Sequence, residues 1–477
     1  RPNTNNYAAT VATQAKFLDE IARQKVPQTS MNPEEVAMRE EFRVKLEALG
    51  QKAFRDAYPE SKSTLRFIPY GSILSGFAVT GSDMDIICSW DGPRPDLPPE
   101  EIPRMLEKVF LAEKIGARAL TKTRVPILKI CEEPPLELLT ALTEEHEKWQ
   151  NEVDAGDVSA TTPTSPVEAG TEVKTPTEDQ SKSGLNESKK ADSESAHPSS
   201  NENKDKQEGQ KSTFWRREKP SGPLDFPKTG AGYQCDISFR SILGMYNTQL
   251  LRCYNACDPR VHDMVIFIKA WAKQRKINNS YSGTLCSYGW VLLVLHYLMN
   301  VATPPVVPNL HHFGANDREF LVDGFNVSFA DNETEIRRLA IQRKITRNTE
   351  STGSLLRGFF HYYAHQGSRV ARGGFKWKDE VVAIKNVSGI VSKASKNWTG
   401  ASNTMVNNVE VRQRYLLAIE CPIEDNHNVA RTVHHHGVVA IRDELRRAWS
   451  IIESVGQGRM PQVSLFDEVL APEIVAP

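Results

Sequence analysis

Several features that would place a protein in a familiar class are missing from this 477-residue sequence. The cysteines are seven, an odd number, and form no CxxC pair: Cys88, Cys131, Cys235, Cys253, Cys257, Cys286 and Cys421. This pattern excludes a disulfide framework and a cysteine zinc site, and it favours reduced thiols. The longest apolar run, around Trp290 to Met299, is too short to cross a bilayer, and no charged-then-apolar leader opens the chain. We therefore expect a soluble protein of the cytosol or the nucleus with no membrane partner, and of these two we choose a cytoplasmic location.

The charges nearly cancel in sum but are uneven along the chain. The formal net charge is −1, yet between 132 and 219 acidic side chains outnumber basic ones, which leaves a basic excess elsewhere. Such an excess is compatible with a polyanionic ligand. The stretch 152–222 is rich in Ser, Thr, Glu, Lys and Pro and cannot bury enough apolar area to offset its ordering entropy. We interpret it as a disordered insertion.

Hydrophobic periodicity predicts the regular elements. Helical spacing predicts helices over 7–24, 34–58, 136–151, 261–277, 287–300, 335–347 and 354–365. Apolar or alternating runs predict strands over 64–70, 84–90, 124–130, 232–239 and 377–384. The strands before and after the insertion are expected to belong to one sheet, from which the insertion loops out.

The sharpest local signal is Gly71-Ser72, followed after ten intervening residues by Asp83-Met84-Asp85. In a strand, residues two apart face the same way, so both carboxylates project from one face. Paired carboxylates at this spacing suit hard divalent cations, which take oxygen ligands. A lone Asp-x-Asp is more often a turn acid beside a solvated edge acid. Here the amides and hydroxyl of the Gly-Ser turn could hold phosphate oxygens, and the combination favours a functional site.

A third acid, Asp236, strengthens this interpretation. In the strand that contains it, Ile237 and Phe239 occupy the opposite face, so Asp236 projects away from the apolar side. A lone acid in such a place is usually exposed and inert. Three acids on adjacent strands would instead bind two metal ions, one lowering the pKa of an attacking hydroxyl and the other stabilising a leaving pyrophosphate.

Further motifs follow in order towards the C-terminus. They are Asn247-Thr248, Lys269-Ala-Trp-Ala-Lys273, Tyr281-Ser-Gly-Thr-Leu-Cys-Ser-Tyr288 and Pro304-Pro-Val-Val-Pro-Asn-Leu310. Together with Gly71-Ser72 and the three aspartates, this run resembles the terminal uridylyltransferase and poly(U) polymerase family of the polymerase-β nucleotidyltransferases. The resemblance continues through 348–365 and 377–386, which look like the poly(A)-polymerase-associated region, and it ends near Val433.

The resemblance implies an α+β fold: a small mixed-sheet, polymerase-β-like nucleotidyltransferase domain and a mostly helical central, poly(A)-polymerase-associated domain. We expect N-terminal helices over 1–58 that pack on the central domain, and a catalytic domain over 59–250 interrupted by a mostly disordered insertion at 134–228. The central domain is expected over 251–450, with a tail over 451–477. The nucleotide is expected to bind between the two domains.

The resemblance also implies a set of site residues. The catalytic residues, and the ligands of two Mg²⁺ or Mn²⁺ ions, would be Asp83, Asp85 and Asp236. The nucleotide-binding residues would be Gly71, Ser72, Asn247, Thr248, Lys269, Lys273, Ser287, Tyr288 and His427.

Within this set, each nucleotide contact has a distinct implied role. The two lysines lie four apart on one helical face, where they can grip a triphosphate, although composition alone would make them a solvated face. Tyr288 would stack on the base, and Ser287 would reach the phosphates. Asn247 would bind the ribose 2′-OH, and Thr248 would lie near the base. Taken alone, Tyr288 would be a half-buried tyrosine at a helix start.

Two departures from the family pattern concern nucleotide choice. Where many relatives have Asn after the third aspartate, this chain has Arg240-Ser241. The stretch Ile423 to Arg431 is several residues shorter than the base-reading loop of relatives, and His427 aligns there with a histidine associated with uridine preference. The insertion and the altered loop resemble the fungal enzymes that tag mRNA with C and U.

The resemblance therefore predicts a monomeric RNA nucleotidyltransferase. It would add nucleotides from UTP or CTP, with ATP a further substrate, to the 3′ ends of single-stranded RNA. The added nucleotides would mark mRNA for decay, together with mRNA-decay partners. An ATP-selective poly(A) polymerase would share every catalytic residue. A non-catalytic RNA scaffold should have lost a carboxylate, and a small-molecule nucleotidyltransferase would not need the long helical domain. No RNA-recognition module is evident in the sequence, so primer choice would depend on the cleft, on flanking regions outside this sequence or on a partner.

Overall fold

A computed structural model describes residues 4–121, 123, 125–155, 215–218, 221–239, 242–314, 319–365, 373–406 and 409–469. The chain forms two compact units, one of residues 1–148 and 216–477 and the other of residues 149–215. Most of the predicted insertion, residues 156–214, lies outside the described residues, as do Arg240 and Ser241. The sheet and helices that carry the predicted site all belong to the first unit.

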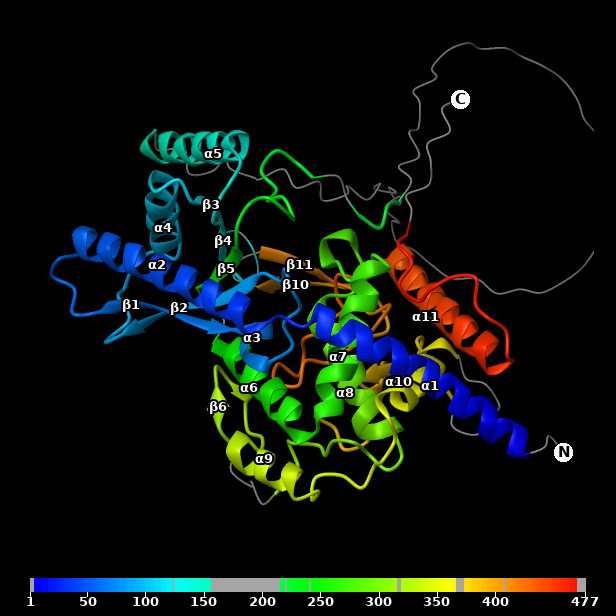
Figure 1. Cartoon of the computed structure of the whole chain (residues 1–477). Coiled ribbons are helices and arrows are strands. Elements are labelled where there is room, and N and C mark those ends of the chain that lie inside the picture. Colours follow the sequence, from blue (N-terminus) through cyan, green and yellow to red (C-terminus); the bar gives the residue numbers. More distant parts are fainter. Residues whose placement is uncertain are drawn as a thin grey trace, which may run out of the picture. The chain divides into compact units, whose positions relative to one another are not determined.

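A mixed sheet of five strands carries the predicted acids (Figure 1). Its strands are β1 (Thr64–Tyr70), β2 (Met84–Asp91), β3 (Gly116–Leu120), β4 (Ile127–Cys131) and β5 (Gln234–Ser238). They lie in the order β1-β2-β5-β4-β3, with β2 and β5 parallel and all other neighbours antiparallel. The strands that flank the insertion, β4 and β5, are direct neighbours. The prediction that both belong to one sheet is confirmed.

One face of the sheet is apolar and covered by helices. Its buried residues alternate along the strands and include Leu65, Phe67, Met84, Ile86, Leu128, Ile130, Cys235 and Ile237. The helices α2 (Pro33–Ala57) and α4 (Glu101–Ala112) pack into this core with Phe42, Leu46, Leu106 and Phe110. The helix α2 begins after Asn32, whose side chain caps it by accepting a backbone N–H.

The opposite face of the sheet presents one transverse row of five residues, one from each strand. The pairing register aligns, across β1, β2, β5, β4 and β3 in turn, the residues Tyr70, Asp85, Asp236, Lys129 and Arg118. Residues that are paired across neighbouring strands point to the same face of a sheet. The row therefore places two of the three predicted acids side by side, with two cations beyond them.

The C-terminal half of the first unit is mostly helical (Figure 1). Its helices are α6 (Ile242–Cys257), α7 (Pro259–Gln274), α8 (Ser287–His296), α9 (Glu333–Ile341), α10 (Thr352–Ala364) and α11 (His435–Gly456). Trp271 of α7 meets Trp290 of α8 and Phe360 of α10 edge to face, with ring centroids 5.7 Å and 5.0 Å apart. All three rings are fully buried, so they form a rigid aromatic core for this half.

The remaining elements are mostly short and lie outside the five-stranded sheet and the main helices of the C-terminal half. They are α3 (Gly71–Ser75), α5 (Leu136–Asp154), η1 (Ser280–Ser282), the π-helical turn Tyr297–Val301, β6 (Leu321–Val322), β7 (Phe325–Asn326), β8 (Glu380–Val382), β9 (Ile390–Ser392), β10 (Ser402–Val406) and β11 (Val409–Gln413). The strands β6 to β11 form three antiparallel pairs, each of two strands that follow one another in the chain.

The α+β fold class is confirmed, but the N-terminal helices need a correction. The first helix, α1 (Thr4–Thr29), packs on α7, α10 and α11. The second helix, α2, packs on β1 and α4 instead of on the central domain, because its apolar side chains enter the core of the sheet. The strand predicted over 377–384 is limited to β8, and the helix predicted over 335–347 ends at Ile341.

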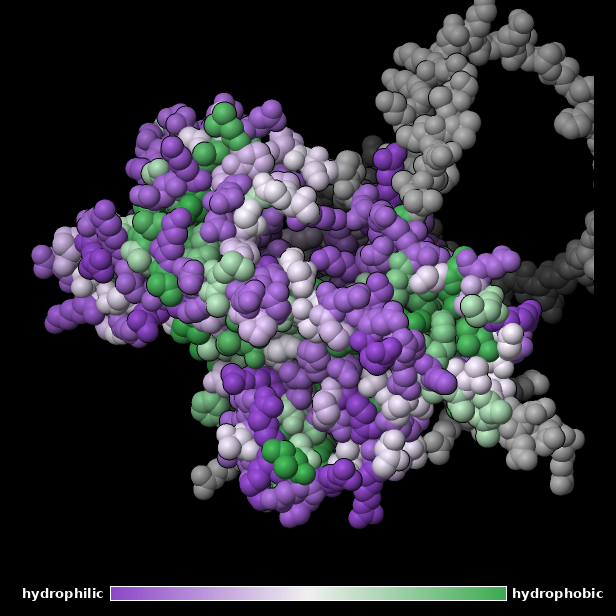
Figure 2. All heavy atoms as spheres, viewed as in Figure 1, coloured by the Kyte–Doolittle hydropathy of each residue, from purple (hydrophilic) through white to green (hydrophobic). Residues whose placement is uncertain are grey.

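Polar side chains cover most of the face seen in Figure 2, where hydrophobic residues occur in small groups. Isolated exposed apolar side chains, such as Ile341 and Met460, are normal on a protein surface. Within the described ranges, no helix has both the length and the apolar character that a membrane crossing needs.

Candidate active site

The three predicted acids meet at one end of the β2–β5 pair. Asp85 on β2 lies directly opposite Asp236 on the parallel strand β5, and Asp83 comes one residue before β2 begins. Burial, and then the charges of Asp236 and Asp83, raise the pKa of Asp85 to about 7. Desolvation by the surrounding protein, and then Asp236, also raise the pKa of Asp83. The site therefore concentrates negative charge that favours cations.

The Gly-Ser turn packs directly on this acid cluster. Gly71 begins α3 with φ +72°, and a Cβ added there would come within 2.1 Å of Oδ2 of Asp85. Its N–H donates to Oγ1 of Thr248 at 2.9 Å, and that hydroxyl donates to the Gly244 carbonyl at 2.8 Å. The backbone N–H of Ser72 donates to the Asp85 carboxylate, which opposes the rise in its pKa. The hydroxyl of Thr248, predicted near the base, thus holds the turn.

Two buried residues of α2 support the turn before Asp83, although no motif of the sequence marks them. Oε1 of Glu35 accepts the Gly81 N–H at 3.1 Å and pairs with Nη2 of Arg39 at 2.8 Å. The Arg39 guanidinium lies 4.9 Å from the centroid of the Tyr233 ring, and its charge opposes the raised pKa of Asp83. A Glu and an Arg four apart on a helix usually form a solvated pair, so only their burial reveals this role.

The two predicted phosphate-binding lysines lie beside the acids. Lys269 on α7 is 4% exposed, and its Nζ donates to the carbonyl of Phe77. Burial lowers the pKa of Lys269 to about 8, although the charge of Asp85 works in the opposite direction. Lys273, one helical turn further, is exposed, and its charge is among those that oppose the raised pKa of Asp83. The structure therefore brings both ammoniums close to the acid cluster, where an anionic ligand would need them.

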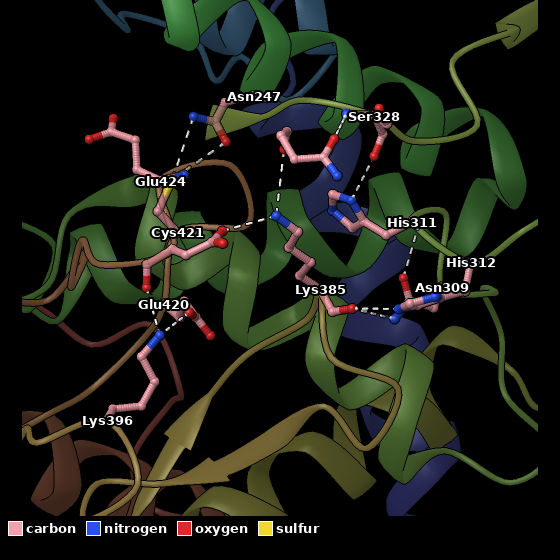
Figure 3. A network of polar contacts seen from close by, with 12 residues as sticks. Asn247, Asn309, His311, His312, Ser328, Lys385, Lys396, Glu420, Cys421 and Glu424 are labelled. Carbon is pink, nitrogen blue, oxygen red and sulfur yellow. Dashed lines mark hydrogen bonds and ion pairs between the residues drawn. The ribbon is translucent and has the colours of Figure 1, made fainter. Parts of the chain in front are cut away.

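The residues predicted to hold the nucleoside form a second cluster. Oη of Tyr288 donates to Oδ1 of Asn247 at 2.6 Å, and Sγ of Cys421 lies 3.7 Å from Nδ2 of Asn247. Figure 3 shows Asn247 directed towards Cys421. Ser287 exchanges hydrogen bonds with Asn278, the shorter at 3.0 Å. Nothing in the sequence selects Cys421, because a lone cysteine usually packs as a small apolar group.

Cys421 lies just before the predicted base-reading loop, Ile423 to Arg431, which contains His427. The Cys421 N–H donates to the His427 carbonyl at 3.0 Å, and Nε2 of His427 lies 3.1 Å from Nη1 of Arg431. The loop is therefore tied through Cys421 to the Asn247 cluster.

Two lysines outside the base-reading loop brace it (Figure 3). Lys396 forms an ion pair with Glu420, just before the loop, and its Nζ also donates to the Asp425 carbonyl at 2.7 Å. Nζ of Lys385 lies 2.9 Å from the Asp425 carboxylate. Because the Glu420 and Lys396 side chains are largely buried, this pair restrains the loop more than a surface pair would.

An all-oxygen donor set is present where metal ions are expected. Within the described residues, no group of three His, Cys, Asp or Glu side chains is already arranged to hold a metal ion. Asp236 is engaged by Lys129, whose Nζ lies 3.0 Å from Oδ1. The chemistry of the acids still suits a hard divalent cation, because such an ion takes oxygen ligands and would neutralise carboxylates whose pKa is raised by burial and then by their mutual repulsion.

The site has carboxylates on neighbouring strands of a mixed sheet, a Gly-Ser turn packed on them and a lysine pair beside them. These features define the polymerase-β class of nucleotidyltransferase folds. Residues 351–427 match the family described as Cid1 family poly A polymerase, and residues 18–143 match the central palm domain of mitochondrial-like poly(A) RNA polymerase. Terminal uridylyltransferase cid1 of Schizosaccharomyces pombe is 41% identical over 244 residues. Over these parts the chain is similar to the Cid1 family of terminal uridylyltransferases and poly(U) polymerases.

The extent of these similarities differs between sequence and structure. The alignment with cid1 covers 51% of this chain and 56% of that protein, so the chain spans about half the length of this curated relative. A solved structure on the structural plasticity of Cid1 superimposes with a TM-score of 0.63 at 27% identity, over 96% of this chain and 99% of that chain. A Cid1 structure with bound MgGTP gives a TM-score of 0.59 at 28% identity, over 95% and 98% of the two chains.

Proposed function

We propose that the protein is a template-independent RNA nucleotidyltransferase that adds pyrimidine nucleotides, from UTP or CTP, to the 3′ end of single-stranded RNA. The observation that carries the proposal is the parallel register that sets Asp85 opposite Asp236, with Asp83 one residue before the strand. The similarity to terminal uridylyltransferase cid1 supports the pyrimidine preference. In this proposal the enzyme acts as a monomer in the cytoplasm, and the added tail marks mRNA for decay by partner proteins.

The proposal assigns the divalent ions to the acid cluster. Asp83 and Asp85 would hold two ions, Mg²⁺ or Mn²⁺, and Asp236 would hold the one beside the primer. When bound, such ions lower the pKa of an attacking hydroxyl and stabilise a leaving pyrophosphate. The oxygen-only donor set supports this assignment, because hard divalent cations take oxygen ligands.

The chain's own residues would bind and orient the substrates around the acids. Lys269 and Lys273 neutralise the triphosphate, and the burial of Lys269 strengthens its interaction with an anion. Tyr288 offers its ring to the base, while its hydroxyl fixes Asn247 for a contact with the ribose 2′-OH. In this proposal Asp236 would also accept the proton of the primer's 3′-OH. Catalysis in this scheme is positioning plus electrostatic stabilisation, with no covalent intermediate.

An ATP-using poly(A) polymerase is the second candidate, because both matched family descriptions name poly(A) polymerases. It would use the same acids and lysines and would differ where the base is read. The residues that bear on this choice are His427, its neighbour Arg431 and the braced loop that holds them. Assignment to the fungal subgroup that adds C and U stays a prediction.

The test is extension of a labelled short RNA by the full chain with Mg²⁺ or Mn²⁺ and each ribonucleotide in turn. Extension with UTP or CTP that is lost in the Asp83→Ala/Asp85→Ala variant would support the proposal, and extension with ATP alone would support the poly(A) polymerase. Asp91→Ala, which removes an exposed acid at the far end of the same strand, is the matched control and should extend RNA normally. No extension under any condition would overturn the enzymatic function.

A further inference from the structure

Lys129 lies against the acids, although no motif of the sequence assigns it a role. Its Nζ lies 3.0 Å from Oδ1 and 3.4 Å from Oδ2 of Asp236, so the ammonium engages both carboxylate oxygens. The contact follows from the register, because Lys129 and Asp236 are direct partners in the antiparallel β4–β5 pair. The two side chains are 25% and 29% exposed, which makes this a partly desolvated ion pair and not a chance meeting on the surface.

The surroundings of Lys129 direct it towards the acids. Its other cross-strand neighbour is Arg118 on β3, a like charge, and Arg118 is itself bound to Glu145 of α5 at 3.1 Å. Asp83 and Tyr281 also interact electrostatically with Lys129. Lys129 therefore lies between acids, Asp236 and Asp83, and a cation, Arg118, that is already paired with Glu145.

The ammonium and a divalent ion would compete for the same ligand. Under the proposed function Asp236 must offer its oxygens to a metal ion, but in this structure Lys129 holds both of them. A metal ion that enters the site without a nucleotide has to displace this resident charge and also meets the field of Lys269 and Lys273. A bound triphosphate changes this balance, because its negative charge attracts the metal ion and offers the displaced ammonium a new partner.

We propose that Lys129 is a resident cation of the active site, which suppresses metal binding to the nucleotide-free enzyme and so makes the metal ions bind together with the nucleotide. This inference rests on the proposed function, because it takes Asp236 as a metal ligand. Binding linkage is reciprocal, so the nucleotide must raise the affinity for the metal by the same factor as the metal raises the affinity for the nucleotide. Removal of Lys129 should weaken this coupling.

The experiment measures Mn²⁺ binding to the full chain by electron paramagnetic resonance, without RNA. In the absence of nucleotide, Lys129→Met should bind Mn²⁺ about tenfold or more tightly than the wild type, within the usual range of such couplings. With a non-hydrolysable UTP analogue present, the two proteins should differ much less. Lys129→Arg keeps the competing charge and should behave like the wild type.

Lys273→Met is the matched control for charge alone. It removes a cation whose charge acts on Asp83 from outside the β4–β5 pair, so it should raise the Mn²⁺ affinity less than Lys129→Met does. Equal Mn²⁺ affinities for wild type and Lys129→Met, or an equal gain in Lys273→Met, would overturn the inference. Melting curves in EDTA show whether each variant is folded. Melting curves in Mn²⁺ show how much the ion stabilises it, and a Lys129→Met protein that Mn²⁺ stabilises no more than the wild type would also overturn the inference.

Failure of the inference and failure of the proposed function are distinguishable. RNA extension by the wild type together with unchanged Mn²⁺ binding in Lys129→Met would overturn the role of Lys129 alone. Absence of RNA extension by the wild type, together with tighter Mn²⁺ binding in Lys129→Met, would overturn the nucleotidyl transfer and support the competition at Asp236.

Discussion

The carboxylate of Glu35 accepts the backbone N–H of Gly81 at 3.1 Å, so a helix near the start of the chain holds the turn that delivers Asp83. The same oxygen pairs with Arg39, and both residues are buried, with exposed fractions of 9% and 4%. Breaking a buried pair is more disruptive than breaking a surface pair, because it leaves one charge uncompensated. This link ties the position of a predicted metal ligand to the packing of α2.

We therefore expect Glu35→Ala to lower kcat about tenfold or more with little change in the KM for nucleotide, because the turn before Asp83 loses its anchor. Glu35→Gln keeps an oxygen acceptor for Gly81 and should recover part of the rate. Steady-state kinetics at saturating metal measure both. Glu40→Ala, an exposed acid on the same helix, is the control. A Glu35→Ala enzyme with the kcat of the wild type would show that the contact does not position Asp83.

A second prediction concerns the glycine of the Gly-Ser turn. Gly71→Ala should abolish detectable nucleotide addition, because its Cβ would lie 2.1 Å from Oδ2 of Asp85 in a backbone with φ +72°. Gly81→Ala is a close control, since its φ is +70° but no atom lies within 4 Å of the added Cβ. Both carry the same backbone strain, so RNA extension and melting curves separate strain from collision. Equal losses in the two variants would contradict the collision.

The third prediction concerns Tyr288. Loss of its ring in Tyr288→Ala should raise the KM for the nucleotide about 5- to 150-fold, since stacking on one base contributes roughly 1–3 kcal/mol. Tyr288→Phe keeps the ring but removes the bond to Asn247, so it should mainly reduce discrimination between ribonucleotides and deoxyribonucleotides. Competition between UTP and dUTP measures this. If Tyr288→Phe and Tyr288→Ala raise the KM equally, the ring does not stack.

A fourth prediction follows from the pKa of Asp85, which is raised from 3.8 to about 7. Below pH 7 the carboxyl is mostly protonated, so Mn²⁺ affinity should fall about tenfold for each further pH unit. The stability of the metal-free protein has the opposite trend. Because the folded pKa lies above the unfolded one, the contribution of Asp85 is present at low pH and is lost as pH rises from about 4 to about 7. Urea unfolding in EDTA at pH 5 and pH 8 should show this loss, and Asp85→Asn should reduce it.

The fifth prediction concerns the brace of the base-reading loop. Lys396→Met leaves the largely buried Glu420 without its partner, so the loop should become more mobile. The differences in kcat/KM among UTP, CTP and ATP should then become smaller. Lys376→Met removes a more exposed lysine from a 3.8 Å pair with Glu380 and should change nothing. Competition among the nucleotides at fixed RNA is the measurement. An unchanged preference in Lys396→Met would mean that the brace does not serve base choice.

The acid cluster was predictable from sequence because its signals are local. Asp83 and Asp85 are two apart at the start of a strand, and Asp236 interrupts an alternating apolar strand. The order of the strands is not local, and only the structure shows that Asp85 and Asp236 are direct partners in parallel strands. The same kind of non-local pairing places Lys129 on Asp236, which no spacing along the chain could indicate.

Other features escaped prediction for different physical reasons. The strand β3 is short and built mostly of small residues, so it lacks the β-branched and aromatic side chains that mark strands. The helix α4, by contrast, has a regular apolar face at Ile102, Leu106 and Phe110, and its spacing could have revealed it. For α2, a helix was predicted, but amphipathic spacing does not tell a helix which partner to cover. Its placement on the central domain was wrong for that reason.

The direct pairing of β4 and β5 has a practical consequence for engineering. Five residue pairs, from Ile127 with Ser238 to Cys131 with Gln234, lock the two strands together across the long stretch of chain that separates them. The entropy of closing a loop grows only with the logarithm of its length, about 0.6 kcal/mol for each doubling. A reporter domain whose own ends lie close together could therefore be grafted into this stretch, between residues 155 and 215, while the row from Tyr70 to Arg118 keeps its alignment.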